Sequence, residues 1–276
     1  MIAPVVDWSW LDAHIDEVIL VDSRWYLDGR SGRDAYDQGH IPGAVYIDLD
    51  RWLSGLGGPA VGRHPLPNPS VFAEGMSESG IGDGATVVAY DDAGGVIAAR
   101  IVWMLRALGE SAALLDGGLQ SYKGTLQTGK QSRTRAVFSP RPWPADLLAT
   151  IDEATDRKNI VLDARNRDRY RGEADPVDPR FGHIPGAINI PCRENLNQDG
   201  TFLPVPVLLQ RFREAGVADA KEVISYCGSG VTACHNLLAM EFVGLGRGRL
   251  FPGSWSQYSN AADRLVAVGS EPSRTI

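Results

Sequence analysis

One cysteine stands in a glycine-rich loop of a kind that can hold a nucleophile. A short apolar run, 223–226, predicts a buried strand, and a leucine-rich stretch beyond residue 233 predicts a helix. Between them lie the loop residues Cys227, Gly228, Ser229, Gly230, Val231 and Thr232. We therefore expect Cys227 at a strand-to-helix turn, which is where open α/β sheets bind their ligands.

The chemistry of this loop favours a reactive thiolate. Gly228 and Gly230 lack a Cβ atom, so successive backbone N–H groups are free to point inward. The following helix adds the positive end of its dipole, and Ser229 and Thr232 add hydroxyl donors. Together these groups are expected to stabilise the Cys227 thiolate and make it a nucleophile. The alternative is a buried cysteine that packs as a small apolar side chain.

Two other uses of a nucleophilic cysteine fit the loop poorly. A phosphatase-type loop needs an arginine six residues after the cysteine to clamp a phosphate, and Ala233 stands there. A cysteine hydrolase needs a general base beside the thiol. His235 is close in sequence, but it is expected on the helix, away from the loop mouth, as a packed or capping residue.

The chain contains the same pattern twice. Gly-His-Ile-Pro-Gly-Ala occurs at 39–44 and 182–187, and Asp-x-Arg occurs at 22–24 and 163–165. Two further blocks repeat in the same order, which indicates a duplicated domain. In this alignment Asp91 stands at the position of Cys227, so only the second copy carries the thiol. Chemistry is expected where the copies differ.

The duplication predicts two α/β domains. The expected limits are 1–128 for the first, 129–145 for a proline-punctuated linker and 146–276 for the second. Each domain is expected to hold a mainly parallel sheet flanked by helices. The expected strands are 18–21, 86–90, 113–115, 160–162, 223–226 and 249–251, and a helix is expected over 100–108, before Gly109.

Composition excludes several classes of function. The 27 Lys and Arg residues against 34 Asp and Glu residues give a net charge of −7, which argues against a nucleic-acid partner. No apolar run is long enough to span a membrane, and the N-terminus does not resemble a signal peptide. Three cysteines do not form a disulfide framework, so a reducing, cytoplasmic setting is expected. No metal-binding motif is apparent, and neither a metal nor an organic cofactor is implied.

These motifs together resemble the tandem, two-domain form of the rhodanese family of sulfurtransferases. The resemblance covers nearly the whole chain and includes Asp116-Gly117-Gly118 and Pro252-Gly253-Ser254-Trp255. It implies two rhodanese-like domains, with an inactive first copy that carries Asp91 in place of cysteine. It also implies a double displacement in which Cys227 takes sulfur from a donor as a persulfide and passes it to an acceptor.

The loop after Cys227 is similar to that of the 3-mercaptopyruvate sulfurtransferases in this family. Thiosulfate-preferring members carry basic residues there, and this chain does not. The resemblance implies 3-mercaptopyruvate as the donor, and a thiol or cyanide, including a thioredoxin-like protein, as the acceptor. Two alternatives stay open: a thiosulfate sulfurtransferase, and a persulfide carrier or regulatory module for a dedicated protein acceptor.

The resemblance also assigns roles to side chains outside the loop. Ser229 is expected to transfer protons or position the donor, in a relay with His40 and an acidic partner, for which Asp34 is the best local match. His40 has an equal alternative as scaffold, because His183 occupies the same motif in the second copy. Arg169 and Arg180 are expected to bind the donor carboxylate beside the loop residues Gly228, Gly230, Val231 and Thr232.

The other motif residues and cysteines are interpreted as structural. The pairs Asp22–Arg24 and Asp163–Arg165 are expected to form internal ion pairs, since both copies carry them. Cys192, Cys234 and Trp255 are expected to pack in the interior.

Overall fold

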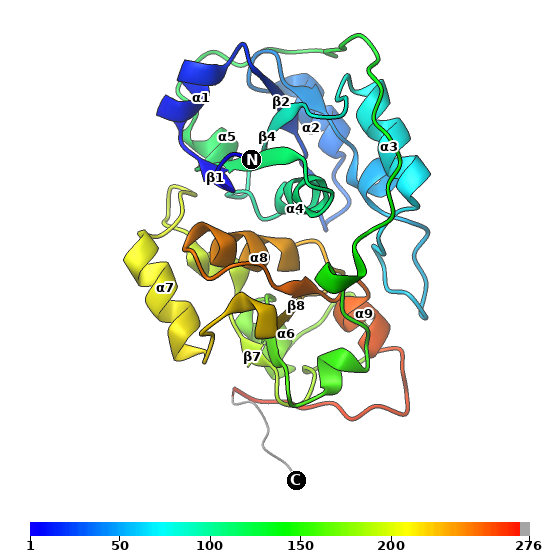
Figure 1. The fold of residues 1–276 in the computed structure, drawn as a ribbon. Coiled ribbons are helices and arrows are strands. Elements are labelled where there is room, and N and C mark those ends of the chain that lie inside the picture. Colours follow the sequence, from blue (N-terminus) through cyan, green and yellow to red (C-terminus); the bar gives the residue numbers. More distant parts are fainter. Residues whose placement is uncertain (271–276) are drawn as a thin grey trace. The chain divides into compact units, whose positions relative to one another are not determined.

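The computed structural model describes residues 1–270, and the chain forms two compact units (Figure 1). The first unit contains Met1–Gly55, Leu66–Pro144 and Leu196–Phe202, and the second contains Leu56–Pro65, Ala145–Asn195 and the chain from Leu203 onward. Two short segments therefore belong to the unit formed by the other half of the sequence. The expected domain limits, with a linker between residues 128 and 146, did not place 56–65 in the second unit or 196–202 in the first.

The expected linker packs against the first unit over most of its length. Phe138 is buried, and its N–H donates to the Oγ of Ser77 over 3.0 Å. The indole N–H of Trp143 donates to the carbonyl oxygen of Pro67 over 2.8 Å. Residues 129–144 are thus part of the first unit, because the rings of Phe138 and Trp143 both pack against the ring of Phe72 there.

The first unit holds a five-stranded parallel sheet with the strand order β1-β5-β4-β2-β3. Its strands are β1 (Val5–Val6), β2 (Val18–Asp22), β3 (Val45–Tyr46), β4 (Thr86–Tyr90) and β5 (Ser111–Leu115). Its helices are α1 (Trp8–His14), α2 (Gly32–Gln38), the π-helical turn η1 (Leu49–Leu53), α3 (Pro69–Glu78), α4 (Ala99–Ala107) and α5 (Gly118–Ser121). The helix expected over 100–108 corresponds to α4, which ends before Gly109 with its φ of 84°.

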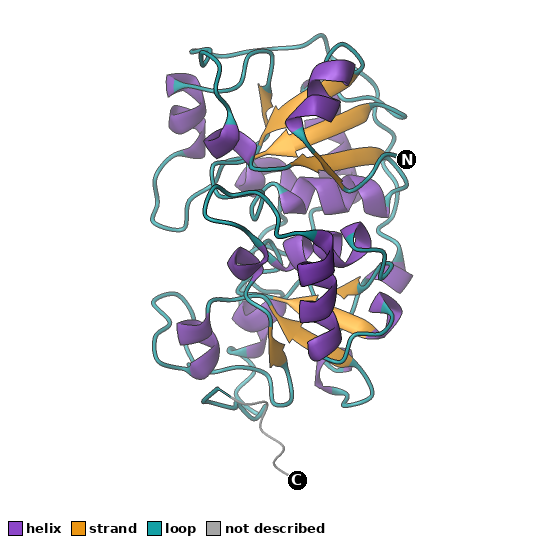
Figure 2. Ribbon diagram, turned by 90° about the vertical axis from the view of Figure 1, so that its left-hand side faces the viewer, coloured by secondary structure: helices purple, strands orange, loops and turns teal. Residues whose placement is uncertain are grey.

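The second unit holds a four-stranded parallel sheet with the order β7-β6-β8-β9. Its strands are β6 (Ile160–Asp163), β7 (Ile188–Asn189), β8 (Val223–Tyr226) and β9 (Arg249–Leu250). Its helices are α6 (Arg167–Arg171), α7 (Val205–Glu214), α8 (Ala233–Phe242) and α9 (Ser254–Tyr258), with short 3-10 turns η2 (Ala145–Leu147), η3 (Glu153–Thr155), η4 (Cys192–Asn195) and η5 (Ala220–Glu222). Figure 2 shows helices on both sides of the strands in each unit, so the predicted fold class is confirmed.

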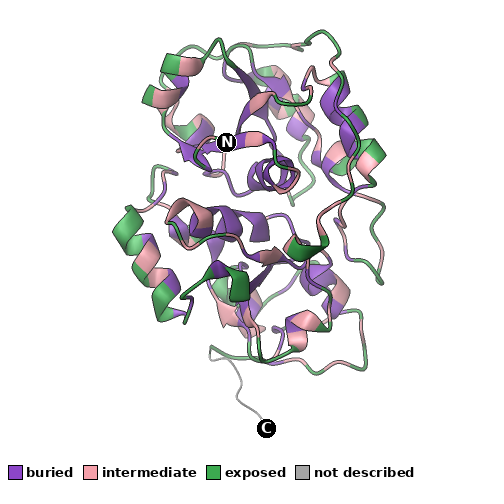
Figure 3. Ribbon diagram, in the orientation of Figure 1, coloured by how far each residue is buried: buried purple, intermediate pink, exposed green. Residues whose placement is uncertain are grey.

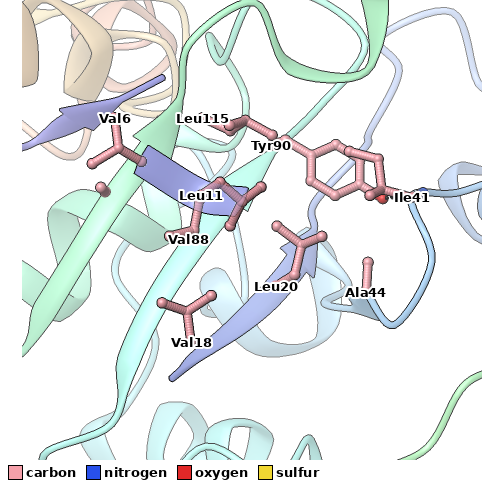
Figure 4. Packing of buried hydrophobic residues seen from close by; sticks show 10 residues of the cluster. Val6, Leu11, Val18, Leu20, Ile41, Ala44, Val88, Tyr90 and Leu115 are labelled. Atoms are coloured by element: carbon pink, nitrogen blue, oxygen red, sulfur yellow. Dashed lines mark hydrogen bonds between the residues drawn. The ribbon is translucent and has the colours of Figure 1, made fainter. Parts of the chain in front are cut away.

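Burial explains why the strands read as continuous apolar runs. All five residues of β2 and all four of β8 are buried, as expected for strands covered on both faces (Figure 3). Figure 4 shows the core of the first unit, where Val6, Leu11, Leu20, Val88 and Tyr90 pack together. The two-residue strands β1, β3 and β7 were not expected, because two residues are too few to show a periodicity.

Two buried ion pairs at strand ends repeat between the units. The guanidinium of Arg24 lies 2.7 Å from the carboxylate of Asp22, and that of Arg165 lies 2.6 Å from Asp163. Each arginine also donates to a backbone carbonyl oxygen, that of Gly39 or Gly182, which directly precedes a repeated histidine. The prediction of internal ion pairs is confirmed. Among residues 1–270, no helix is both long enough and apolar enough to cross a membrane.

Candidate active site

Cys227 follows β8, which pairs with β6 and β9, so the cysteine leaves the middle of its sheet at the carboxyl edge. The backbone N–H of Gly230 donates to its Sγ over 3.1 Å. The N–H of Cys227 itself donates to the Oγ of Ser254 over 3.2 Å. The side chain is only 2% exposed, so the thiol lies at the bottom of the loop with an amide dipole turned toward it.

The two loop glycines are required for different physical reasons. Gly230 has a φ of 78°, and a Cβ atom there would lie 2.5 Å from the carbonyl oxygen of Pro252. Gly228 instead lies close to two guanidinium groups. A Cβ atom on Gly228 would lie 2.9 Å from the Nη2 of Arg63 and 3.2 Å from the Nη1 of Arg169. The absent side chain therefore lets two cations approach the residue next to Cys227.

Ser229 is hydrogen-bonded to a histidine that the sequence analysis did not select. Its Oγ lies 2.8 Å from the Nδ1 of His64, and both residues are buried. His64 reaches this position because 56–65 packs in the second unit. The N–H of Arg63 donates to Ser256 Oγ over 2.9 Å, and the side-chain amide of Gln257 donates to the carbonyl of Ala60 over 2.7 Å. These bonds hold the segment beside the loop that follows Cys227.

His40 and Asp34 have local partners within the first unit. The Nδ1 of His40 is 2.9 Å from the carbonyl oxygen of Tyr36, and the two rings stack with centroids 3.9 Å apart. His183 repeats this arrangement on Tyr170, at 2.8 Å and 3.7 Å. Asp34 is exposed in the first turn of α2. Because both copies build the same histidine–tyrosine stack, the geometry favours the scaffold interpretation of His40.

Arg169 lies beside the loop, as expected, within a network of buried carboxylates. Its Nη2 is 3.0 Å from Asp175 and 2.9 Å from Asp178. The guanidinium of Arg63 pairs with the other carboxylate oxygen of Asp178. Burial raises the pKa of Asp178, and Arg63 and Arg169 oppose that shift. Asp178 therefore bridges two arginines that both face Gly228.

Arg180 has a different set of partners from the one expected. Its guanidinium donates to four backbone carbonyl oxygens at 2.7–2.8 Å, those of Tyr258, Ser259, Ala261 and Arg264. This geometry ties α9 to the loop that follows it. A guanidinium that donates to four backbone carbonyl oxygens has little capacity left to bind a sulfur donor, so this geometry favours a structural role for Arg180 over the predicted one.

In the first unit, Asp91 fills the place of the cysteine with a carboxylate held by backbone amides. One oxygen accepts from the N–H groups of Ala93 and Gly95, both at 2.7 Å. The other accepts from Ile97 and Ala98, at 2.7 Å and 2.9 Å. Burial raises the pKa of Asp91 and the four N–H groups oppose that shift. The loop after β4 is therefore an anion-binding nest closed by its own side chain.

The other two cysteines are interior residues. Cys192 is fully buried, and burial raises the pKa of its thiol to about 12, with a further upward contribution from the charge of Cys227. The hydroxyl of Thr232 and the cation of Arg193 act in the opposite direction. The thiol of Cys234 donates to the carbonyl oxygen of Gly230 over 3.4 Å. All three cysteines are free thiols, and the interior positions predicted for Cys192, Cys234 and Trp255 are confirmed.

A cavity of about 420 Å³ opens beside Arg63 and His64, and neither Cys227 nor Arg169 is among the residues that line it. Its lining comes from the inserted segment and from the loop before Arg180, and includes Gly62, Arg63, His64, Asp178 and Ser256. A volume of this size is within the range of small-molecule sites. The arrangement combines a thiol, a hydroxyl–imidazole pair and two cations, which suits nucleophilic chemistry on a small anion.

The sequence did contain a signal for the missed residues. Arg63, His64 and Pro65 belong to a glycine- and proline-rich stretch of the first copy, and the second copy has no histidine at the corresponding place. The same rule that selected Cys227, a difference between the copies, would have selected His64 had it been applied to this stretch.

Comparison with known proteins identifies relatives over almost the whole chain. Residues 7–125 and 144–261 each match the rhodanese-like domain family. A probable 3-mercaptopyruvate sulfurtransferase of Pseudomonas aeruginosa is 41% identical over 92% of this chain and 93% of its own length. The putative thiosulfate sulfurtransferase SseB of Mycobacterium tuberculosis is 38% identical, with 92% of each chain covered. The 3-mercaptopyruvate sulfurtransferase structure from Leishmania major superposes with a TM-score of 0.84 at 30% identity, covering 94% of this chain and 75% of that one.

Proposed function

The chain belongs to the rhodanese family and is a sulfurtransferase, and on this premise we propose that it moves sulfur from 3-mercaptopyruvate to a thiol or cyanide through a persulfide on Cys227. The relatives named above include both mercaptopyruvate and thiosulfate enzymes. The choice of donor, the covalent intermediate and the residue roles that follow are therefore part of the proposal.

The observation that carries the proposal is the amide nest occupied by Asp91. The N–H groups that bind this carboxylate in the first unit belong to residues 93, 95, 97 and 98. Their counterparts in the second unit include Ser229, Val231 and Ala233, and within residues 1–270 these three N–H groups have no hydrogen-bond acceptor. The second unit thus has an anion site without a built-in anion, next to the Sγ of Cys227. A persulfide sulfur would supply that anion.

The first half-reaction follows from these groups. The Cys227 thiolate attacks the sulfur of mercaptopyruvate, an S–S bond forms, and the carbon–sulfur bond of the donor breaks. The electron pair of that bond goes to the carbon of the pyruvate enolate, and the proton of the donor thiol is transferred to this carbon to give pyruvate. The negative charge moves from the cysteine sulfur to the outer persulfide sulfur, where the free N–H groups of the loop stabilise it.

We assign the proton transfer to Ser229 and His64. Ser229 follows Cys227 by two residues, and its hydroxyl is held 2.8 Å from the imidazole of His64. A hydroxyl that both donates and accepts can pass a proton between the donor and the imidazole. His64 takes the place in this relay that the sequence had offered to His40, and Asp34 is left outside it.

The second half-reaction returns the enzyme to its thiolate form. An acceptor thiol or cyanide attacks the outer sulfur, the S–S bond breaks, and its electron pair returns to the Sγ of Cys227. Cyanide leaves as thiocyanate, and a thiol leaves as its own persulfide. The acceptor in this proposal is a thiol or cyanide, and a thioredoxin-like protein is one thiol acceptor of this kind.

The direct test is the mass of the intact protein after mixing with mercaptopyruvate. We expect an increase by one sulfur atom, its location on Cys227 after digestion, and its loss on addition of cyanide with formation of thiocyanate. The variant C227S should show neither the adduct nor turnover. An adduct that persists in C227S, or turnover at the normal rate in that variant, would refute the proposal.

A further inference from the structure

Two guanidinium groups converge on the residue after Cys227. A Cβ atom placed on Gly228 would lie 2.9 Å from the Nη2 of Arg63 and 3.2 Å from the Nη1 of Arg169. Arg169 comes from α6, whereas Arg63 comes from the segment 56–65 of the first half of the sequence. The catalytic loop itself carries no basic residue, so its local positive charge comes entirely from outside the loop.

Both arginines retain unused hydrogen-bond donors. Arg63 uses one terminal nitrogen on Asp178, and Arg169 uses its Nη2 on Asp175 and Asp178. In the part of the chain that the structure describes, the Nε atoms of Arg63 and Arg169 are buried without a partner. The nitrogens nearest Gly228 include Arg63 Nη2 and Arg169 Nη1, for which no acceptor is present among residues 1–270. An anionic ligand beside Gly228 would accept hydrogen bonds from these two terminal nitrogens, and such charge-assisted bonds are stronger than those between neutral groups.

Asp178 pairs with both arginines and offsets part of their positive charge. Its two carboxylate oxygens contact different arginines, and its side chain is only 2% exposed. Asp175 is shared by Arg169 and Arg165, and Arg165 is paired with Asp163. Asp178 is therefore the carboxylate that neutralises Arg63, and the net charge next to Gly228 depends on it.

We propose that Arg63 is a second anion-binding residue of the sulfur-donor site, and that Asp178 sets how much positive charge this site presents to the donor. The proposal rests on the function proposed above. Thiosulfate carries two negative charges, whereas mercaptopyruvate carries one carboxylate beside a neutral ketone. Because electrostatic attraction scales with the charge of the ligand, Arg63 contributes more to the use of thiosulfate than to the use of mercaptopyruvate. The absence of basic residues within the loop then does not exclude thiosulfate as a donor.

The test compares kcat/KM for the two donors in R63Q and D178N. R63Q removes one positive charge, and we expect kcat/KM for thiosulfate to decrease about tenfold or more, with a smaller decrease for mercaptopyruvate. D178N removes one negative charge while preserving the shape of the side chain. In D178N the ratio of kcat/KM for thiosulfate to that for mercaptopyruvate should rise, whereas in R63Q the ratio should fall.

R167Q is the matched control for this experiment. Arg167 lies on the same helix as Arg169, but its guanidinium pairs with the partly exposed Glu194, so R167Q removes the same charge from an ion pair that does not include Arg63, Arg169 or Asp178. The donor ratio should be unchanged in R167Q. R63K keeps the charge and should retain most of the thiosulfate activity that R63Q loses. If D178N does not fold, R63Q and R63K decide the question by themselves.

The result that would overturn the inference is an unchanged donor ratio in R63Q, or a ratio that falls in both R63Q and D178N. The second result would mean that Asp178 only positions the arginines. Both results are distinct from a failure of the proposed function, which would appear as the absence of sulfur transfer from either donor in the unmodified protein. Raising the salt concentration should reduce thiosulfate use more strongly than mercaptopyruvate use, because screening acts on the same charges.

Discussion

The imidazole of His64 is hydrogen-bonded to the hydroxyl of Ser229 at 2.8 Å, although 165 residues separate them in sequence. The bond depends on the segment 56–65, which leaves the first half of the chain to pack in the second unit. Gly62 makes this approach possible, since its φ is 87° and a Cβ atom there would lie 2.4 Å from the carbonyl oxygen of Gly253. A residue from the copy that lacks the cysteine therefore contacts the loop that follows Cys227.

Replacing His64 should impair catalysis without unfolding the protein. We expect H64Q to lower kcat/KM for mercaptopyruvate by roughly 10²-fold, the usual contribution of one acid–base residue. The matched control is H40Q, which removes a buried ring stacked on Tyr36. H40Q should lower the free energy of unfolding by roughly 1–3 kcal/mol and leave kcat/KM of the folded protein nearly unchanged. The reverse pattern, with catalysis lost only in H40Q, would restore the relay first expected from the sequence.

Replacing Arg180 should affect stability and not donor binding. R180Q leaves up to four backbone carbonyl oxygens around α9 without their donor. An unmade bond of this kind typically costs about 1–3 kcal/mol, so a lower midpoint in urea unfolding is expected. KM for mercaptopyruvate should stay within about twofold, because the guanidinium does not serve the donor. A large increase in KM with unchanged stability would instead support donor binding by Arg180.

Removing the charge of Asp91 should destabilise the first unit. Each carboxylate oxygen of Asp91 accepts from two N–H groups, so the variant D91N, which replaces one oxygen by an NH2 group, leaves two N–H groups without their acceptor. We expect the free energy of unfolding to fall by about 1–3 kcal/mol, measured with urea. The persulfide-forming step should continue at its normal rate, since Asp91 is not at the reactive loop. Equal stability of D91N and the unmodified protein would mean that the nest does not require an anion.

The thiols of Cys227 and Cys192 should react at different rates with an alkylating reagent. The pKa of Cys192 is raised to about 12 by burial, so at pH 8 only about one molecule in 10⁴ carries the Cys192 thiolate. Iodoacetamide at that pH should modify Cys227 and spare Cys192, as measured by peptide mass spectrometry. Prior conversion of Cys227 to the persulfide should move the label to the outer sulfur. Modification of Cys192 as fast as Cys227 would contradict this assignment.

The raised pKa of Cys192 also predicts that the stability of the protein depends on pH. The folded protein holds the Cys192 proton more tightly than the unfolded chain, whose thiol has a pKa near 9.0. Stability is therefore retained below pH 9 and declines as pH rises from about 9 to about 12, by at most about 1.4 kcal/mol per pH unit from this group. Urea unfolding of C192A should show a shallower decline over this interval. Parallel declines in the two proteins would show that other groups cause the loss.

Much of the scaffold could be predicted because its determinants are contiguous in sequence. The strands β2, β4 and β8 are largely apolar runs covered on both faces. The apolar side chains of each run therefore indicate a buried strand without reference to the rest of the chain. The Asp–Arg pairs join residues two positions apart, so repetition in both copies was enough to identify them. The placement of Cys227 at a turn followed in the same way, from a strand, two glycines and a helix that are adjacent in the chain.

The partners of the loop were decided only by the tertiary structure. Arg63 meets Asp178 across 115 residues, and His64 meets Ser229 across 165. Each of these side chains lies in a short irregular segment, where no periodicity indicates which surface a residue faces. The amino-acid sequence by itself determined the position of Cys227 at the end of a buried strand and the sheet that presents it, because local backbone geometry and burial follow from neighbouring residues. The placement of Arg63 and His64 beside the loop was determined by how 56–65 packs on α9, since a contact between distant segments depends on shape and hydrogen bonding that no single stretch of sequence encodes.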